Sequence, residues 1–144
     1  MTIRPAQESD FARVTELLEE LGRPRIPDAE YGDYRQAYLE QLESPDSDHL
    51  VAVDDGFVVG FCSLVFRPRL NAVRPEAWVP DLIVESSARG RGAGRALLDE
   101  VEARARARGC FGISLESGHE RREAHLLYRM VGMEDAGKYF RKWL

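Results

Sequence analysis

The sequence predicts one α/β domain, in which a mixed and mostly antiparallel sheet carries helices on both faces. Three observations lead to this fold class. A length of 144 residues suits one domain of ordinary size, and no linker, internal repeat or low-complexity tract divides the chain. β-Rich runs alternate with amphipathic helical segments. The fourth and fifth expected strands, residues 77–84 and 110–116, are separated by a helix, so we expect these two strands to run parallel.

The first half of the chain is expected to form a strand, two helices and a β-hairpin. Ser9 or Asp10 can cap a helix whose apolar residues recur at helical spacing, and Gly22 ends that helix. The segment Asp54-Asp55-Gly56 favours a tight hairpin turn between two β-rich runs. The expected elements, in chain order, are an extended start at residues 3–6, a helix over about residues 11–21, a helix over about residues 31–44, and strands at residues 49–53 and 57–66.

The second half is expected to add three strands and two helices. Pro80 lacks the N–H that a ladder hydrogen bond needs, so we expect a bulge or a local break within the fourth strand. Gly109 and Gly132 follow the two helical segments and end them. The expected elements are a strand at residues 77–84, a helix at residues 90–108, a strand at residues 110–116, a helix at residues 120–131 and a last short strand at residues 139–144.

Composition and charge argue against several classes of partner. The formal net charge of -5 and the pI near 5.3 disfavour nucleic acid or an anionic membrane surface as the main partner. No apolar run approaches the roughly 18 residues that cross a bilayer, and the first residues lack a signal-peptide pattern, so we expect a cytoplasmic protein. Cys62 and Cys110 have no Cys or His nearby at metal spacing, so we expect buried free thiols and no metal site.

A glycine-rich turn directly after the fourth strand has the features of a diphosphate-binding site. Residues 89–95 read Arg-Gly-Arg-Gly-Ala-Gly-Arg and open a helix. Free backbone N–H groups, the positive end of the helix dipole and nearby guanidinium groups would together bind a pyrophosphate. The residues concerned are Arg89, Gly90, Arg91, Gly92, Ala93, Gly94 and Arg95.

The same glycine spacing also occurs in structural tight turns and in dinucleotide sites. The dinucleotide fingerprint follows the first strand of a βαβ unit, with an acidic residue about 20 positions later. This turn instead comes after roughly 80 residues of helices and hairpin, which disfavours that alternative. The Walker pattern fails as well, because no Lys-Ser/Thr pair follows.

Several segments of the chain are similar to one known family. The pattern Arg89-x-x-Gly92-x-Gly94 matches a Gln/Arg-x-x-Gly-x-Gly/Ala signature, and residues 80–84 look like the strand that precedes it. The start Ile-Arg-Pro-Ala and residues 124–128 with Gly132-Met133 look like its first and last segments. Over nearly its whole length the chain thus resembles the GNAT superfamily of acetyl-CoA-dependent N-acetyltransferases. It departs from that family at Arg121, where Asn is frequent.

The resemblance implies acetyl-CoA as the acetyl donor, with its pyrophosphate over residues 89–95 and its pantetheine arm along Leu82, Ile83 and Val84. It also implies that the fourth and fifth strands splay apart, so that the exposed backbone of residues 82–84 pairs with the amide groups of the arm. One of these backbone N–H groups would then stabilise the tetrahedral oxyanion. Arg121 and His125, near the last helix, are expected to contact the coenzyme.

Acyl transfer needs a proton donor near the sulfur and a proton acceptor near the amine. Tyr128 stands where the family places the tyrosine that meets the coenzyme sulfur, although a tyrosine on an amphipathic helix is by default a core residue. Asp81 would act as the general base or hold a cationic acceptor; the alternative is a residue that only faces water. Other carboxylates, in order of preference, are Glu116, Glu85 and Glu76.

Two walls of the expected acceptor site point to different amines. Tyr31 and Tyr34, with their acidic neighbours, would suit a cation, unless they belong to a packed aromatic stripe. The basic wall of Arg67, Arg69 and Arg74 would suit an acceptor that carries a carboxylate. The acceptor therefore stays open between a polyamine, an amino acid, an aminoglycoside-like drug, and a protein N-terminus or lysine.

Two functions of other kinds stand as alternatives. A non-catalytic acyl-CoA-binding regulatory module would keep the turn at residues 89–94 without transfer chemistry. A non-catalytic interaction domain with an incidental glycine turn would not bind CoA. Homodimers are common among similar proteins, and the apolar end at residues 139–144 permits one.

Overall fold

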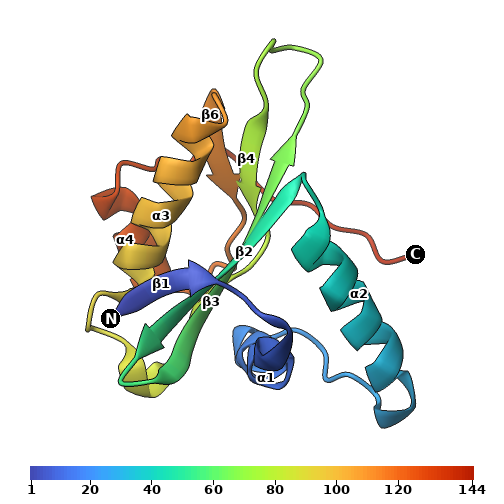
Figure 1. Ribbon diagram of the computed structural model, residues 1–144. Coiled ribbons are helices and arrows are strands. Elements are labelled where there is room, and N and C mark those ends of the chain that lie inside the picture. Colours follow the sequence, from blue (N-terminus) through green and yellow to red (C-terminus); the bar gives the residue numbers. More distant parts are fainter.

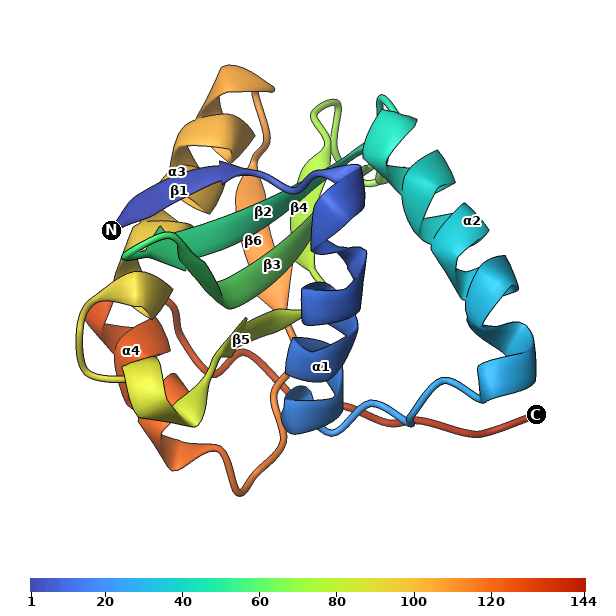
Figure 2. The ribbon, with the colours of Figure 1, turned by 60° about the horizontal axis from the view of Figure 1, so that its bottom comes forward.

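A six-stranded sheet carries helices on both faces in the computed structural model, which describes all 144 residues (Figure 1). Helices α1 and α2 cover one face, and α3 and α4 cover the other (Figure 2). None of the helices combines the length and the apolar composition of a membrane span. The helices are α1 (Phe11–Leu21), α2 (Tyr31–Glu43), α3 (Ala93–Ala107) and α4 (Arg122–Met130). The strands are β1 (Thr2–Pro5), β2 (Ser47–Asp54), β3 (Phe57–Arg67), β4 (Glu76–Val79), β5 (Leu82–Val84) and β6 (Gly112–Leu115).

The sheet is mixed, as the sequence predicts. Its order is β1-β2-β3-β4-β6, and β5 pairs with β3 beyond the end of β4. Every pair is antiparallel except β4 with β6, which run parallel because α3 lies in the connection between them. The β2–β3 hairpin turns at Asp55 and Gly56, whose positive φ angles of 48° and 79° match the twist of the strands. The predicted fold class is therefore confirmed.

The break expected at Pro80 divides the predicted fourth strand into β4 and β5. On one side, β3 continues past the break: its residues 65–67 pair with β4 and its residues 60–62 pair with β5. At the break, Ser63 N–H donates to Asp81 O, and Asp81 N–H donates to Ser63 Oγ, each over 3.0 Å. On the other side, β6 pairs with β4 alone. The edge of β5 that would face β6 is therefore open.

Two glycines let α3 lie close to its neighbours. A Cβ atom on Gly60, in β3, would lie 3.1 Å from Ile83 O and 3.3 Å from Leu97 Cδ1 of α3. A Cβ atom on Gly94, in α3, would lie 2.8 Å from Leu127 Cδ2 of α4. A methyl group at Gly60 would press on the backbone oxygen of Ile83, whereas one at Gly94 would have to displace the end of the Leu127 side chain. The two glycines therefore allow the first turns of α3 to pack tightly against both the sheet and α4.

Both cysteines are free, as predicted, but only Cys62 is fully buried; Cys110 is partly exposed. Burial raises the pKa of both thiols, which keeps them protonated at neutral pH. No three His, Cys, Asp or Glu side chains lie together in an arrangement that could hold a metal ion. The thiols are therefore part of the packing of the sheet.

The prediction of a last strand at residues 139–144 is wrong. Residues 134–144 contain no helix or strand, every one of them is exposed, and the last backbone hydrogen bond of the chain joins Met133 N–H to Tyr128 O. The segment has strand-forming residues, but a strand also needs a neighbour that accepts and donates its backbone hydrogen bonds, and none lies beside it. In both views the C-terminus lies out beside α2 (Figures 1 and 2).

A buried carboxylate fixes the start of α1 against β1. The Arg4 guanidinium donates two hydrogen bonds to the Asp10 carboxylate, at 2.7 and 3.0 Å, and Gln7 N–H donates a third at 2.8 Å. Burial alone would raise the pKa of Asp10, but these donors outweigh it and leave the pKa below its ordinary value. The ionised carboxylate therefore stabilises the folded state.

Asp10→Asn should lower the free energy of unfolding by about 1–3 kcal/mol at neutral pH, the cost of losing hydrogen bonds to a charged group. Because the folded-state pKa is lowered, this contribution is complete above the ordinary aspartate value of about 4 and is lost as the pH falls through the folded-state pKa. Urea unfolding of both proteins over a range of pH measures the difference. Glu8→Gln, which breaks an exposed pair with Arg35, should cost less than about 0.5 kcal/mol. An Asp10→Asn loss that is as large in acid as at neutral pH would contradict the role of the charge.

Candidate active site

The glycine-rich turn follows β5 and leads directly into α3. Gly90 and Gly92 have φ angles of 80° and 88°, so the chain turns here and α3 begins at Ala93, not at residue 90 as predicted. The first helical hydrogen bond runs from Ala96 N–H to Gly92 O over 2.9 Å. The N–H groups of residues 90–95 donate to no protein acceptor. A cluster of free donors therefore lies at the positive end of the helix dipole.

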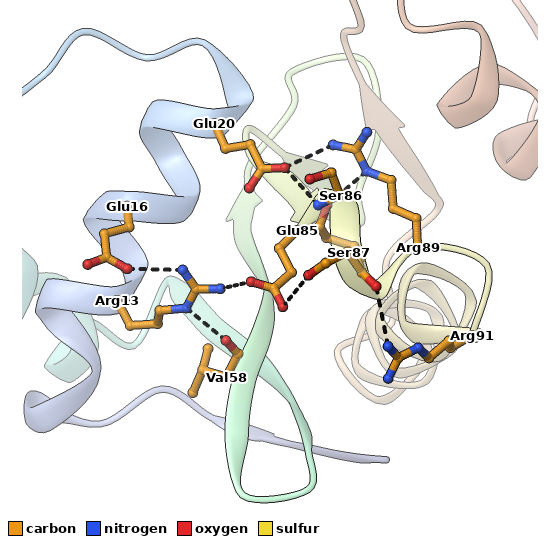
Figure 3. A network of polar contacts seen from close by, with 10 residues as sticks. Arg13, Glu16, Glu20, Val58, Glu85, Ser86, Ser87, Arg89 and Arg91 are labelled. Atoms are coloured by element: carbon orange, nitrogen blue, oxygen red, sulfur yellow. Dashed lines mark hydrogen bonds and ion pairs between the residues drawn. The ribbon is translucent and has the colours of Figure 1, made fainter.

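Helix α1 holds the beginning of this turn (Figure 3). The Glu20 carboxylate accepts a hydrogen bond from Ser86 N–H at 2.8 Å and another from Arg89 Nη2 at 3.4 Å. Glu20 and Ser86 are 66 residues apart in the chain, so no local pattern in the sequence indicates this contact. The contact fixes the position at which the chain leaves β5.

A second contact from α1 reaches the same segment (Figure 3). Arg13 Nε donates to Val58 O at 2.9 Å, and its guanidinium also pairs with Glu85. Glu85 accepts a further hydrogen bond from Ser87 Oγ at 3.0 Å. Glu85, a minor candidate base in the sequence, is thus committed to contacts that hold the turn.

Each of the three arginines of the turn is bonded to an acceptor of its own, and all three side chains are about half exposed. Exposed ion pairs of this kind contribute little to stability. A diphosphate bound at the turn would therefore compete with these acceptors at small cost. The contacts are Arg89 Nε with Val84 O at 3.0 Å, Arg91 Nη1 with Asp54 Oδ2 at 3.0 Å, and Arg95 Nε with Asp99 Oδ1 at 2.9 Å.

The open edge of β5 presents backbone groups next to the turn. Asp81 O and Glu85 N–H, on either side of the strand, both make hydrogen bonds to β3. In an antiparallel pair, alternate residues direct their backbone groups to the same side. The backbone groups of Ile83 therefore face β3 as well, and those of Leu82 and Val84 face the open edge. Of the three strand residues predicted to bind the coenzyme, two direct their backbone groups to the open edge, where Val84 O already accepts the hydrogen bond from Arg89 Nε.

Tyr128 projects from α4 into the core next to β5. Its side chain is 8% exposed and belongs to the buried cluster that contains Leu82 and Cys62. Burial raises the pKa of the phenol above its ordinary value, and the positive charge of Arg121 and the Ser117 hydroxyl offset this only in part. The phenol is therefore protonated at neutral pH and can donate a proton.

Helix α4 and the residue before it carry the other predicted coenzyme contacts. His125 and Tyr128, three residues apart, lie on one side of the helix, and Arg121 is the residue directly before its first turn. The rings of His125 and Tyr128 lie 6.4 Å apart, centroid to centroid. His125 Nε2 lies 3.1 Å from Ser117 Oγ in the loop after β6. This side of the helix thus runs from that loop toward the buried phenol.

Asp81 lies at the break between β4 and β5, in a cluster of polar groups. Its carboxylate accepts hydrogen bonds from Ser63 Oγ at 2.8 Å and from Arg23 Nε and Nη2 at 3.0 and 2.8 Å. Arg23 Nη2 also donates to Pro80 O at 2.9 Å. The Asp81 side chain is 21% exposed. Arg23, in the loop after α1, therefore occupies a position beside the carboxylate that a cationic ligand would otherwise take.

Glu116, directly after β6, is held by a residue that sequence reasoning missed. Trp78 Nε1 donates to Glu116 Oε2 at 2.8 Å, and the Arg67 guanidinium lies 4.7 Å from the centroid of the Trp78 ring. Strand alternation places Trp78 on the same face as Glu76 and Ser114. This alternation is the one feature of the sequence that indicates the contact between Trp78 and Glu116. We call the surface formed by Asp81, Trp78 and Glu116 the acceptor face.

The basic wall expected beside this face is only partly neutralised, because two of its arginines share one carboxylate and the third has none. Arg67 Nε and Arg69 Nη1 donate to the Glu76 carboxylate at 2.7 and 3.2 Å, and Ser114 Oγ donates to it at 3.1 Å. Burial alone would raise the pKa of Glu76, but these partners outweigh it and lower that pKa. Arg74 is exposed and makes no ion pair. Glu76 is therefore committed to a local cluster and is poorly placed to accept a proton.

The tyrosines of α2 divide into packed and open side chains. The rings of Tyr31 and Tyr38 both lie 5.1 Å from the ring of Phe11, centroid to centroid. Tyr38 OH donates to Gln7 O at 2.6 Å, and burial raises the pKa of Tyr38 to about 12. Tyr34 is 49% exposed. Tyr38 and part of the Tyr31 side chain therefore belong to a packed aromatic stripe, whereas Tyr34 faces solvent.

Comparison with known proteins agrees with this geometry. Residues 11–133 match the family described as the Acetyltransferase (GNAT) family. The chain is 31% identical over 138 residues to YhfO of Bacillus subtilis (strain 168), an uncharacterized N-acetyltransferase. The matched region covers 94% of this chain and 91% of that protein. It is 28% identical over 137 residues to the aminoalkylphosphonate N-acetyltransferase of Salmonella typhimurium, over 95% of this chain and 84% of that protein.

The fold has a similar counterpart among solved structures. The crystal structure of a transcriptional regulator from Bacillus halodurans C-125 matches with a TM-score of 0.90 and 26% sequence identity, over 99% of each chain. The family match includes α1, the open strand β5, the glycine-rich turn and Tyr128. The chain therefore belongs to the GNAT acetyltransferase family and is an acyltransferase.

Proposed function

We propose that this enzyme transfers the acetyl group of acetyl-CoA to a primary amine, by direct attack and through a tetrahedral intermediate. One observation carries the proposal: the open edge of β5 is followed, after a single 3-10 turn at Ser86–Ala88, by the free N–H groups of residues 90–95. The coenzyme has its groups in the same order, with the amides of the pantetheine arm followed by a pyrophosphate. Strand-like pairing suits the first part and a helix N-terminus suits the second, so the two surfaces fit one extended ligand.

Backbone and side-chain groups of the chain would act on the reacting atoms. The Leu82 N–H, on the open edge, would donate to the thioester carbonyl and stabilise the oxyanion by up to a few kcal/mol. As the amine nitrogen bonds to the carbonyl carbon, the carbon–sulfur bond breaks. Tyr128 would give its proton to the leaving sulfur, and a carboxylate would accept the proton that the amine loses. The buried, protonated state of Tyr128 supports its part in this scheme.

Asp81 is our first candidate for that carboxylate, acting directly or through water, and Glu116 is the second. Asp81 is oriented by Ser63 and Arg23, and Glu116 is oriented by the Trp78 indole. Asp81 has the stronger support because it lies next to Leu82, at the end of the open edge. An ammonium group of the acceptor would compete with Arg23 for the Asp81 carboxylate.

We propose a small-molecule or peptide amine as the acceptor, bound at the acceptor face with Tyr31 and Tyr34 on the opposite wall. Both signs of charge meet at this face: Asp81 is paired with Arg23, and Arg67 lies over the ring that holds Glu116. This mixture supports an acceptor that carries an acidic group in addition to its amine. The name of the Salmonella relative, an aminoalkylphosphonate N-acetyltransferase, is in keeping with such a compound.

The remaining expectations are part of the same proposal. We propose an enzyme that works in the cytoplasm as a homodimer, without a metal ion and without a nucleic-acid or membrane partner. The acidic net charge of -5 supports the last point. The alternative is a non-catalytic acyl-CoA-binding regulatory module, which the first experiment below separates from an enzyme.

Thiol release from acetyl-CoA should rise well above background hydrolysis with at least one primary amine. The panel contains a polyamine, an amino acid, an aminoalkylphosphonate, an aminoglycoside and a peptide with a free N-terminus and a lysine. Because the acceptor face carries both charges, an amine with an acidic group should be acetylated faster than its neutral analogue, and mass spectrometry should show the added acetyl group. Binding of acetyl-CoA without acetylation of any amine would favour the regulatory module.

Gly92→Val should abolish coenzyme binding, measured by calorimetry with acetyl-CoA. A β-branched residue at a φ of 88° is strained, and its side chain would change the direction of the free N–H groups. Gly32→Val is the matched control, because Gly32 lies on α2 with an ordinary φ and no neighbour within 4 Å. Circular dichroism confirms that both variants are folded. Unchanged binding of acetyl-CoA by the Gly92 variant would contradict the proposed position of the pyrophosphate at this turn.

Tyr128→Phe should lower kcat by about a hundredfold or more while the Kd for acetyl-CoA stays nearly constant, because only a proton donor is lost. The protonated phenol of Tyr128 is the active form, and its pKa is raised above the ordinary value of about 10. The wild-type rate should therefore fall only above about pH 10. The Tyr128→Phe variant should not show this fall. Tyr38→Phe removes the hydroxyl of another buried tyrosine and should leave kcat within about twofold. Equal effects of the two substitutions on kcat would argue against proton donation by Tyr128.

A further inference from the structure

The end of helix α1 fixes the backbone of Arg23. Gly22 has a φ angle of 104°, and its N–H donates to Glu19 O at 2.9 Å. The Arg23 N–H donates to Leu18 O, also at 2.9 Å. These two hydrogen bonds close the helix in a Schellman motif. Arg23 is therefore held at a defined point beside β5, which lies next to α1 in Figure 2, although it is the first residue of the loop that leads to α2.

The Arg23 guanidinium uses only part of its hydrogen-bonding capacity. Nε and Nη2 donate to Asp81 Oδ1 at 3.0 and 2.8 Å, and Nη2 also donates to Pro80 O at 2.9 Å. A guanidinium has five N–H groups, and the two on Nη1 donate to no protein acceptor. The side chain is 48% exposed. A fixed cation therefore presents two free donors that a ligand can reach.

The Asp81 carboxylate, in contrast, has a partner on each oxygen. Oδ2 accepts the hydrogen bond from Ser63 Oγ at 2.8 Å, and Oδ1 accepts both bonds from Arg23. About one of its four acceptor positions is left, so the carboxylate can still take a proton from a neutral amine. A cationic ligand, however, can pair with it only by displacing an arginine that is also bonded to Pro80 O. This end of the acceptor face is therefore open to an anion and closed to a cation.

We propose that Arg23 selects the acceptor. Its free Nη1 donors bind the carboxylate or phosphonate group of a short amine, and its bond to Asp81 excludes an acceptor that carries a second ammonium group in place of the acid. The inference rests on the proposed function, because it concerns the acceptor of the same reaction. It narrows the acceptors from amines in general to short amines with an acidic group, and it assigns their recognition to one residue.

The geometry requires a short acceptor. The amine has to reach the Asp81 carboxylate and the open edge at Leu82, the next residue in the chain. The acidic group has to reach the Arg23 guanidinium, which is hydrogen-bonded to the same carboxylate. A molecule that makes both contacts therefore has its amine and its acidic group only a few bonds apart.

The arginines of the basic wall are less suited to this task. Arg67 and Arg69 already share the carboxylate of Glu76. Arg74 is exposed and makes no ion pair, so its side chain has no fixed position before an anion arrives. Arg23 is held by the helix cap at its backbone and by the strand break at its guanidinium. A cation that is already ordered loses less side-chain freedom when it binds an anion.

Three acceptors of one length test the selection: 3-aminopropanoic acid, its amide, and 1,3-diaminopropane. In the wild type, kcat/KM should be highest for the acid and lowest for the diamine. In Arg23→Gln, the ratio of kcat/KM for the acid to that for the amide should fall by about tenfold or more, because hydrogen bonds to a charged group are lost. The same variant should acetylate the diamine faster than the wild type does, because the Asp81 carboxylate becomes available to a cation. Circular dichroism checks that the variant is folded.

Two other arginines provide the comparison. Arg25→Gln removes the same charge from the same loop, where the Arg25 side chain is 78% exposed and lies 3.8 Å from Asp28; its acid-to-amide ratio should match that of the wild type. Arg74→Gln tests the basic wall and should also keep the ratio. An unchanged ratio in Arg23→Gln would overturn the proposal. An equal fall in Arg25→Gln, or a fall in Arg74→Gln alone, would overturn it as well.

A titration followed by NMR tests the contact without acetyl transfer. The side-chain Nε–H signal of Arg23 is identified by its absence from the spectrum of Arg23→Gln. With CoA present, which has no acetyl group to transfer, 3-aminopropanoic acid should shift this signal and 1,3-diaminopropane should not. A signal that the acid leaves in place, or that the diamine shifts equally, would contradict the role of Arg23. If no amine were acetylated, the proposed function would fail, whereas this titration would still decide whether Arg23 binds the acid.

Discussion

The site depends on one missing hydrogen-bond donor. Pro80 has no N–H, so the ladder of the predicted fourth strand stops there, and Asp81 N–H turns to the side chain of Ser63. β3 spans the break and keeps the sheet continuous on one side, whereas β6 ends with β4 and leaves the other side open. The strand β5 is thereby left with an unpaired polar edge, which the proposed coenzyme would cover with hydrogen-bond partners of its own.

Close packing and long-range pairs hold the remaining parts around that opening. Gly60 and Gly94 let α3 approach the sheet and α4, and Glu20 and Arg13 attach α1 to the segment that leaves β5. The free N–H groups, the β5 edge and Tyr128 are consequently fixed relative to one another by the core and not by the ligand. In the proposed reaction, such prior placement would lower the cost of orienting the two reactants.

The sequence could predict those features that depend on neighbouring residues. Asp55-Gly56, Pro80 and the glycines at 90, 92 and 94 act on their own backbone, so the hairpin, the break and the turn followed from local chemistry. The contacts Arg23–Asp81 and Trp78–Glu116 join residues 58 and 38 positions apart, and a flexible arginine could reach several carboxylates, so no local pattern distinguishes its partner. The last strand is predicted from composition alone, yet a strand also requires a neighbouring strand to pair with, and residues 139–144 lie beside none.

The two tryptophans of the chain lie in contrasting surroundings. Trp78 is half-buried, with its indole N–H on Glu116 and a guanidinium over its ring, while Trp143 stands in water near the end of the chain. Indole emission shifts to longer wavelength as the surroundings become more polar. The emission of Trp143 should therefore lie at longer wavelength than that of Trp78, so that changes in the surroundings of the two indoles can be followed separately.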